Sequence, residues 1–376
     1  MDLEVSTEKF KKAVSCAARA VSTKAIQPIL GNVLIKGKGD LLLVSATDLD
    51  LYIECRLKAK VEEQGEVTLP AKKVEEIAIR TEGENINIKI DKNQLAKIVA
   101  GKAKFQLNGM SAEEYPEVIS KKTETDVYQI RQEELQRALS MTNFAVSRFE
   151  TSSILSGASF TIKGKEFEIG ATDGSRLAMY IGKMETKGKV EKASFVIPLR
   201  AMLEIERLCS SFKEGNEFVY FYSLPGQIIF YNNDFQISSR LMNGTFPEYD
   251  KLIPKKNQNK AKVKTGLLLD SLDRVSILCN ERTNVVQMSF HKGKSILKID
   301  AKSQDYGSAT DEIDIEYKGD DLDITFNYKY MVEALRSIKE EEVELEMDTS
   351  LSPILMTIDQ ESGFDYTYLI MPVQTR

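Results

Sequence analysis

The sequence has no tryptophan, one histidine and four cysteines among its 376 residues, and no two cysteines form a Cys-x-x-Cys pair. This scarcity gives no support to a zinc site or a disulfide framework. We therefore expect no metal and no cofactor. Cys16, Cys55, Cys209 and Cys279 are interpreted as free thiols, and burial is favoured for Cys16 and Cys209, which lie in helix-like segments.

Long apolar stretches are also missing. No run approaches the roughly 18 residues of a membrane-spanning helix, and the first ten residues, MDLEVSTEKF, contain no apolar signal segment. We expect a soluble protein that works inside the cell.

The common catalytic motifs are absent: there is no HExxH, GxSxG, Walker or GxGxxG pattern. His291 stands beside a turn and is interpreted as a surface residue. Asp173, in Thr-Asp-Gly-Ser-Arg, could be read as a catalytic acid. Its counterpart Asp48 has different neighbours, so a structural role in a turn is favoured. The sequence predicts no active site.

No charge sign dominates. The formal net charge is −6, from 51 Lys and Arg against 57 Asp and Glu. This balance excludes a uniformly basic surface of the kind that many nucleic-acid binders have, but it allows basic and acidic residues to gather on different faces.

The chain repeats itself. A shift of 125 positions carries Ala46-Thr47-Asp48 onto Ala171-Thr172-Asp173, and the same shift carries the helix-like segment 8–21 onto 133–146. A third, more diverged copy follows, in which residues 297–303 match 42–48. Repetition at this period indicates several copies of one domain.

Other landmarks keep their order. Pro70 and Pro198 stand near the starts of predicted helices, and Asn327 takes this place in the third copy. Phe235 corresponds to Phe105, and Pro247 to Pro116. We predict an α+β fold of three tandem domains, residues 1–122, 123–255 and 256–376, each with two helices packed on antiparallel sheets.

Basic residues recur at matching places on the predicted helices. The second helix of each copy has a cation in its first turn: Lys72, Arg200 or Lys329. A positive charge there faces the positive end of the helix dipole, which destabilises the helix by roughly 0.3–1 kcal/mol. Arg207 and Arg336 lie seven residues further on, with Arg80 one position off; Lys12 and Arg137 match on the first helices, where the third copy has Asp270. Phosphate contact is favoured, but a solvated helix face remains open.

The acidic residues gather elsewhere. Residues 311–324 and 339–348 alternate as strands do, which predicts carboxylates on the solvent-facing side of a sheet.

Several segments resemble a known family: QPILGNVLI, VTLPAKKVEEI, ILSGASF, Thr-Asp-Gly-Ser-Arg-Leu, TFPEYDKLIP and the late Met-Pro. From end to end, the chain resembles the bacterial DNA sliding clamp, the β subunit of the replicative DNA polymerase III. The resemblance implies a non-catalytic processivity factor, cytoplasmic and associated with the nucleoid. It also implies a head-to-tail homodimer of three-domain protomers that forms a ring around duplex DNA and slides on sequence-independent phosphate contacts.

The resemblance also implies a groove between the second and third domains that binds short linear motifs of the polymerase catalytic subunit, the clamp loader and repair proteins. By matching positions, its residues are Leu155, Thr172, Gly174, Arg176, Leu177, Pro247, Leu252, Asn327, Tyr330, Met371, Pro372 and Val373. The sequence departs from the family pattern at two places: at Ser175, where relatives can carry a bulkier residue, and in the Gln374-Thr375-Arg376 tail.

The resemblance further places the ring interface at Phe105 and Leu107 of one copy and at Ile277 and Leu278 of the other, although a core position for the last two stays open. Lys24 matches a DNA-contact position, and it joins the DNA-facing set Lys12, Lys72, Arg137, Arg200, Arg207, Lys329 and Arg336.

Two other classes of function remain as alternatives. A repeat protein that binds DNA without encircling it would share the basic helices. A small-molecule enzyme would use the inter-domain cleft and depend on Thr172 or Asp173, although the near absence of histidine argues against it.

Overall fold

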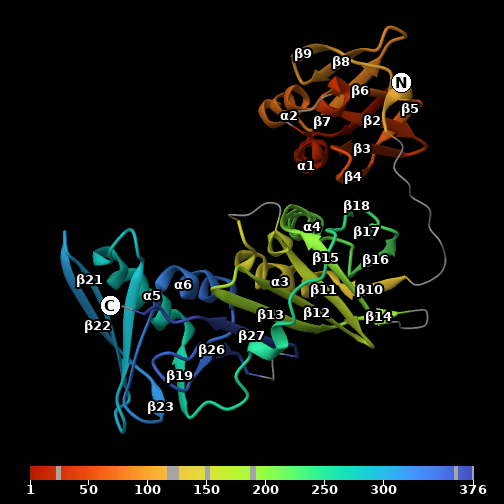
Figure 1. The fold of residues 1–376 in the computed structure, drawn as a ribbon. Coiled ribbons are helices and arrows are strands. Elements are labelled where there is room, and N and C mark those ends of the chain that lie inside the picture. The colour runs from red at the N-terminus through yellow and green to blue at the C-terminus, as the bar shows by residue number, and fades with distance from the viewer. Residues whose placement is uncertain (23–26, 117–126, 149–152, 187–191, 360–362, 375–376) are drawn as a thin grey trace. The chain divides into compact units, whose positions relative to one another are not determined.

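The computed structural model describes residues 1–22, 27–116, 127–148, 153–186, 192–359 and 363–374 (Figure 1). Lys24, Thr375 and Arg376 lie outside these ranges. The chain divides into two units, the first with Met1–Gln136, Met184–Val190 and Arg200–Leu241, and the second with Arg137–Lys183, Glu191–Leu199 and Met242–Arg376.

The described residues form six α-helices, two in each copy of the repeat: α1 Thr7–Ala17, α2 Ala71–Arg80, α3 Gln132–Ser140, α4 Leu199–Ser211, α5 Thr265–Val275 and α6 Tyr328–Ser337. Short 3₁₀ turns are η1 Ala18–Ala20, η2 Pro28–Gly31, η3 Ala112–Glu114, η4 Asn143–Ala145, η5 Ile154–Ser156, η6 Tyr249–Leu252 and η7 Ser276–Leu278. Helices α1 and α2 pack together, and so do α5 and α6 (Figure 1). The first helix was predicted to reach Val21, but regular α-helix ends at Ala17 and η1 continues it.

The first unit contains a five-stranded sheet, β5-β1-β7-β8-β9, and a nine-stranded sheet, β14-β10-β16-β17-β18-β4-β3-β2-β6. Their strands are β1 Asp2–Ser6, β2 Asn32–Lys38, β3 Leu41–Thr47, β4 Leu51–Lys58, β5 Lys60–Glu63, β6 Gly65–Pro70, β7 Asn85–Ile90, β8 Leu95–Ala100, β9 Ala103–Asn108, β10 Tyr128–Arg131, β14 Glu185–Thr186, β16 Phe218–Leu224, β17 Gln227–Tyr231 and β18 Phe235–Arg240.

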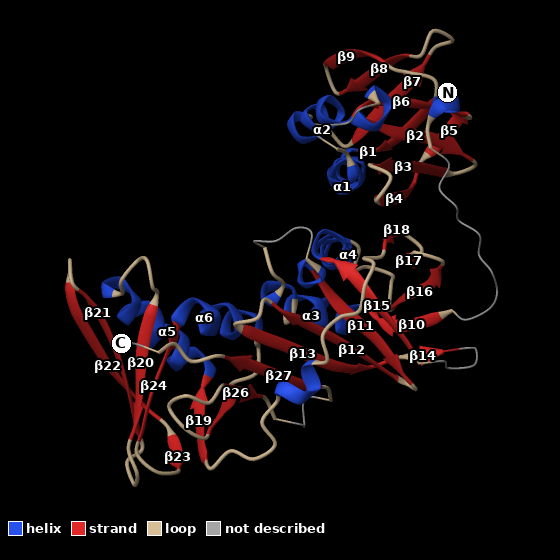
Figure 2. Cartoon of the chain, in the orientation of Figure 1, coloured by secondary structure: helices blue, strands red, loops and turns tan. Residues whose placement is uncertain are grey.

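The second unit contains a nine-stranded sheet, β15-β11-β12-β13-β27-β26-β25-β19-β23, and a four-stranded sheet, β22-β21-β20-β24. Their strands are β11 Gly157–Lys163, β12 Glu166–Thr172, β13 Arg176–Lys183, β15 Ala193–Pro198, β19 Asn259–Lys264, β20 Val285–Phe290, β21 Ile296–Ser303, β22 Gly307–Asp314, β23 Glu316–Lys318, β24 Leu322–Asn327, β25 Glu342–Met347, β26 Ile354–Thr357 and β27 Asp365–Ile370. Figure 2 shows the helices and sheets of both units.

The two nine-stranded sheets have one strand order. The 125-residue shift carries β2, β3 and β4 onto β11, β12 and β13. Strand β18 pairs with β4 as β27 pairs with β13, so these two strands also hold equivalent places. Each sheet therefore joins strands of one copy to strands of the next. The second predicted domain is divided between the two units, because some of its strands belong to the nine-stranded sheet of the first unit and the others to that of the second.

Apolar periodicity explains both kinds of element. In α1, Phe10, Ala13, Val14 and Ala17 are buried and lie on one helix face. In β7, NINIKI alternates between exposed and buried residues, as a strand with one packed face does. The acidic strands behave as predicted, since Val343, Leu345 and Met347 are buried in β25 and alternate with half-buried glutamates.

The repeated Ala-Thr-Asp segments make the same turn twice. Asp48 Oδ1 accepts from the backbone N–H of Leu51 (2.8 Å), and Asp173 Oδ1 accepts from that of Arg176 (3.1 Å). The next residue has positive φ in both turns: 79° at Leu49 and 88° at Gly174. Glycine adopts this conformation without strain. The structural role predicted for Asp173 and Asp48 is confirmed.

Candidate functional site

An apolar cluster lies on one face of the nine-stranded sheet of the second unit. Leu177 of β13 pairs with Leu369 of β27, which pairs in turn with Leu355 of β26. All three are buried and pack with Val196, Phe246 and Tyr249. Leu155, Ile154, Met179, Met242 and Ile253 are half-buried and pack against them. The cluster therefore extends from the core toward the surface of this unit.

Apolar side chains near the C-terminus and in η6 are exposed in the same unit. The exposed fraction is 61% for Leu252, 45% for Met371 and 38% for Val373. Two backbone hydrogen bonds fix the C-terminal segment: Met371 N–H donates to the Ser175 carbonyl (2.9 Å), and Val373 N–H to the Thr325 carbonyl (2.8 Å). Exposed apolar side chains on fixed backbone can receive an apolar ligand.

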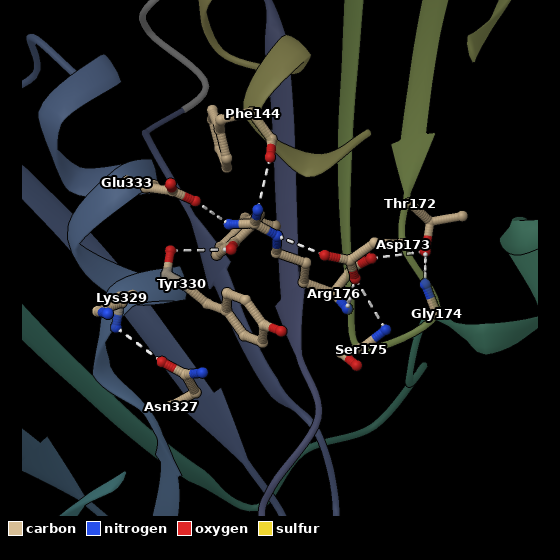
Figure 3. Close-up of polar contacts among 11 residues, drawn as sticks. Phe144, Thr172, Asp173, Gly174, Ser175, Arg176, Asn327, Lys329, Tyr330 and Glu333 are labelled. Carbon is tan, nitrogen blue, oxygen red and sulfur yellow. Dashed lines mark hydrogen bonds and ion pairs between the residues drawn. The ribbon is translucent and has the colours of Figure 1, made fainter. Parts of the chain in front are cut away.

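Arg176 is the polar centre of this region (Figure 3). Its guanidinium donates to Asp173 Oδ2 (3.0 Å), to the Phe144 carbonyl (2.6 Å) and to the Glu333 carboxylate. It also lies over the Tyr330 ring, 4.4 Å from the centroid. Arg176 is only 7% exposed, so it holds η4, the Asp173 turn and α6 together.

The electrostatics of Arg176 favour its charged form. Burial by itself lowers the pKa of the guanidinium, but Tyr368 and the Glu333 and Asp173 carboxylates outweigh burial and raise the pKa overall. Burial raises the pKa of the Tyr368 phenol. Its hydroxyl donates to the Tyr330 carbonyl (2.9 Å), which fixes the start of α6 from a second side.

The side chain of Asn327 caps α6 by accepting a hydrogen bond from the backbone N–H of Lys329 (3.0 Å; Figure 3). A cap of this kind stabilises a helix by about 1 kcal/mol. Asn327 therefore holds, before α6, the position that Pro70 and Pro198 hold before α2 and α4.

The twelve residues predicted for the groove all belong to the second unit, but they differ in exposure. Gly174, Pro247, Leu252, Met371 and Val373 are exposed; Leu155, Asn327, Tyr330 and Pro372 are half-buried; Thr172, Arg176 and Leu177 are buried. The last three support the backbone and the cluster, and they offer little surface to a ligand.

The sequence interpretation missed several members of this region. Glu333 and Phe144 bind Arg176, and Phe246 and Ile154 belong to the apolar cluster or pack on it. Glu333 follows Tyr330 by three residues and so shares its helix face, a spacing that could have identified it. The contact of Phe144 with Arg176 has no comparable signal in the sequence.

The basic residues lie at equivalent helix positions. Lys72, Arg200 and Lys329 are each the second residue of their helix, α2, α4 and α6. Lys12 and Arg137 are each the sixth residue of α1 and α3, where α5 has Asp270. Arg137 is half-buried, and the other described residues of the DNA-facing set, including Arg207 and Arg336, are exposed.

Some of these cations have partners within the protein. Arg200 binds the Asp48 carboxylate and donates to the Arg19 carbonyl (2.8 Å), and Arg336 lies 3.3 Å from Asp273. Both arginines are exposed, so these ion pairs add little stability and leave the guanidinium groups open to solvent.

The residues predicted for the ring interface lie on or beside the edge strands of two sheets. Phe105 and Leu107 are half-buried on β9, the last strand of the five-stranded sheet. Ile277 is 77% exposed and Leu278 half-buried in η7, which contacts the edge strand β22. The alternative that Ile277 is a core residue is wrong.

Within the described ranges, no three His, Cys, Asp or Glu side chains gather as a metal site would require. No helix in that part of the chain has the length and apolar composition to cross a membrane.

Comparison with known proteins covers nearly the whole chain. Residues 1–119, 129–248 and 250–374 match the family models of the N-terminal, central and C-terminal domains of the DNA polymerase III beta subunit. The beta sliding clamp of Synechococcus elongatus is 29% identical over 378 residues, covering 100% of both chains. Two crystal structures cover 100% of both chains: the Bacillus subtilis DNA polymerase sliding clamp (TM-score 0.89, 28% identity) and a Pseudomonas aeruginosa sliding clamp bound to griselimycin (TM-score 0.90, 26% identity). With three consecutive domain matches in the order of its repeats, the chain belongs to the bacterial DNA sliding clamp family, the beta subunits of DNA polymerase III.

Proposed function

We propose that this chain is a processivity factor that encircles duplex DNA as a head-to-tail homodimer and tethers a replicative DNA polymerase to it. The family is non-catalytic, so the chain contributes binding and topology. The observation that carries the proposal is the match of all three domains in order along the chain. We place the domains at 1–122, 123–255 and 256–376, and the protein in the cytoplasm, associated with the nucleoid.

Sheet order supports ring closure. Each nine-stranded sheet combines four strands of one copy of the repeat with five of the next. The four-stranded sheet ends at β22 and the five-stranded sheet ends at β9. If β22 of one molecule pairs with β9 of another, the order β24-β20-β21-β22-β9-β8-β7-β1-β5 becomes equivalent to that of the complete sheets. Two such pairings close a dimer with no free edges at the junctions.

The register of this pairing follows from the complete sheet. Within the first unit, Cys55 of β4 pairs with Phe235 of β18. The hairpin β21–β22 corresponds to β3–β4, with Leu297 at the position of Leu42. Two residues later, Ile299 pairs with Asp311 as Val44 pairs with Cys55, so Asp311 holds the position of Cys55. Phe105 of one molecule then pairs with Asp311 of the other, and Leu107 with Ala309. The same register puts the exposed Lys104 opposite the exposed Glu312, a favourable cross-strand pair.

Phosphate contact is assigned to Lys12, Lys24, Lys72, Arg137, Arg200, Arg207, Lys329 and Arg336. The support is the recurrence of a cation at the second residue of α2, α4 and α6, against the helix dipole. Such contacts carry no sequence information and suit a protein that slides.

Partner recognition is assigned to the groove formed by the twelve residues named above, in which the buried Thr172, Arg176 and Leu177 support the walls and the other nine offer the surface. The apolar cluster, together with exposed Leu252 beside its neighbour Ile253 and exposed Met371 two residues after Leu369, suits the apolar side chains of a short linear motif. The partners would be the polymerase catalytic subunit, the clamp loader and repair proteins. Because no nucleotide-binding motif is found in the sequence, the energy for ring opening must come from the loader.

The DNA assignment is tested by combining Lys72→Ala, Arg200→Ala and Lys329→Ala. Affinity for a short linear duplex should fall, and the slope of log K against log salt should shrink by about 0.9 for each lost phosphate contact. Lys92→Ala, Lys165→Ala and Lys318→Ala remove the same charge from exposed strand and turn positions and serve as the control. Equal losses in both triple variants would show that only net charge matters, and the assignment would be wrong.

A further inference from the structure

The first unit has a pocket on the sheet face equivalent to the one that carries the apolar cluster in the second unit. The pocket has a volume of about 390 Å³, within the range of small-ligand sites. Its floor includes Tyr52, Glu54 and Arg56 of β4 and Gln236 of β18. The 125-residue shift carries the three β4 residues onto Leu177, Met179 and Ile181 of β13.

The two faces therefore share one strand arrangement and differ in chemistry along the row of β4 and β13. Glu54 pairs with Gln236 as Met179 pairs with Thr367. In the second unit the β13 row of Leu177, Met179 and Ile181 is apolar, and the polar residues Ser159, Thr161 and Glu168 lie beside it on β11 and β12. In the first unit the β4 row is itself polar: Tyr52 donates to Glu54 (2.7 Å), and Arg56 donates to Glu54 (2.9 Å) and Gln236 (3.2 Å). A floor of satisfied polar groups is rigid, and it does not favour the apolar side chains that suit the other unit.

A second difference lies in the middle of the face. In the second unit, the Tyr249 ring lies so close over Gly170 that a Cβ atom there would overlap it, and its hydroxyl donates to Glu168 (2.6 Å). Ser45 occupies the equivalent position in the first unit. The Ser45 side chain leaves no room for a ring at that distance, and Ser45 lines the pocket.

Each end of the pocket carries one charged side chain. In its middle, Lys36 binds Glu66 (2.6 Å) and Arg56 binds Glu54. Among the described residues, neither the Lys38 ammonium nor the Glu113 carboxylate has an ion-pair partner. Both are exposed and line the pocket.

These two charges lie at opposite ends. Lys38 is at the hairpin end of β2. Glu113 is in η3, which packs on β6 close to the bridge between Thr68 and Met110, and Thr68 pairs with Leu34 at the other end of β2. Leu34 and Lys38 are four residues apart, or about 13 Å in a strand. An extended segment of about four residues spans the same length.

We propose that this pocket binds a short extended peptide segment of a partner protein, with an acidic group facing Lys38 and a cationic group facing Glu113. Because the first unit alone builds it, occupancy does not depend on the proposed groove of the second unit. The sliding clamp would thus carry two peptide sites of different chemistry on equivalent faces.

The test uses the full-length protein and the peptide acetyl-Lys-Ser-Ser-Asp-amide, with methyl NMR of Leu34 and Leu43 in the pocket and of Met371 and Leu252 in the second unit. The peptide should shift the Leu34 and Leu43 methyl signals with a dissociation constant of about 1 mM or tighter. Peptides with Asp at both ends or Lys at both ends should bind at least about tenfold more weakly, because each places one like charge at an end.

Lys38→Glu makes both ends of the pocket acidic, so the variant should prefer the peptide with two lysines. Lys92→Glu, an equal charge change in the exposed turn between β7 and β8, should keep the original preference. The proposal is overturned if Leu34 and Leu43 do not respond, if Met371 and Leu252 respond instead, or if Lys38→Glu and Lys92→Glu behave alike.

Discussion

The backbone N–H of Met371 donates a hydrogen bond to the carbonyl oxygen of Ser175, at 2.9 Å. This bond ties the C-terminal segment to the turn that Thr172 and Asp173 build. A second bond, from Val373 to Thr325, fixes the segment two residues later. The backbone that carries the exposed Met371 and Val373 side chains is therefore fixed before a ligand arrives, which lowers the entropy that binding costs.

Removal of residues 371–376 should abolish binding of a polymerase-type peptide while the dimer persists, because the segment belongs to the proposed groove and not to the proposed edge-strand pairing. Removal of residues 374–376 alone is the matched control and should leave affinity unchanged. Met371→Ala should weaken binding about tenfold, as loss of a central apolar contact does. Full affinity of the longer truncation in a peptide titration would mean that the groove is misplaced.

Arg176→Ala should destabilise the protein by about 3 kcal/mol, because it leaves Asp173, Glu333 and the Phe144 carbonyl without their shared donor in a region where Arg176 is almost fully buried. Denaturant unfolding measures the loss. Arg176→Lys should recover only part of it, since an ammonium cannot reproduce the planar set of donors. Arg148→Ala, at an exposed arginine, should change stability by less than about 0.5 kcal/mol. A neutral Arg176→Ala would contradict the role given to this residue.

Ring closure predicts a charge-swap result. Lys104→Glu places a negative charge opposite Glu312 across the proposed strand pair. The repulsion should raise the dimer dissociation constant about tenfold. Adding Glu312→Lys to the same chain should restore the affinity. Ile277→Ala with Leu278→Ala should give soluble monomers in sedimentation. An unchanged dimer in that double variant would remove η7 from the interface, and failure of the swap to restore affinity would refute the register.

Glu204 predicts a pH dependence. Burial within α4 raises the pKa of this carboxyl above its ordinary value of 4.5, although Arg19, Arg207 and Arg200 oppose the shift. The folded protein then holds the proton more firmly than the unfolded chain, so stability is lost as pH rises from 4.5 through the folded pKa. Glu204→Gln should be more stable than the parent at neutral pH and should lose less stability over this interval. Glu214→Gln, at an exposed position, should follow the parent curve; a Glu204→Gln curve that does the same would contradict the account.

Much of the fold could be predicted because the same local sequence patterns recur in the copies of the repeat. Pro70, Pro198 and Asn327 placed the starts of α2, α4 and α6, and the recurring Ala-Thr-Asp identified two copies of one turn. Alternation of apolar and polar residues identified the strands. These signals are local, so a single chain contains them.

Contacts between distant residues could not be predicted in this way. The pairing of β4 with β18 joins residues about 180 positions apart, and Arg176 reaches Glu333 across 157 positions. Either pairing depends on how two copies of the repeat pack, which no periodicity encodes. Arg176 and Leu177 were identified by resemblance to the family. Their burial depends on contacts with residues distant in sequence, so only the structure shows it.

Retention on nicked circular DNA, before and after a single restriction cut, tests the central claim most directly. The protein is loaded with the proposed clamp loader and ATP and is followed in moderate salt, where weak phosphate contacts alone should not hold it. A ring should stay on the circle and leave soon after linearisation, because only the free ends release it. Equal retention on circular and linear DNA would mean that the protein binds a DNA surface without encircling it, and the account would fail.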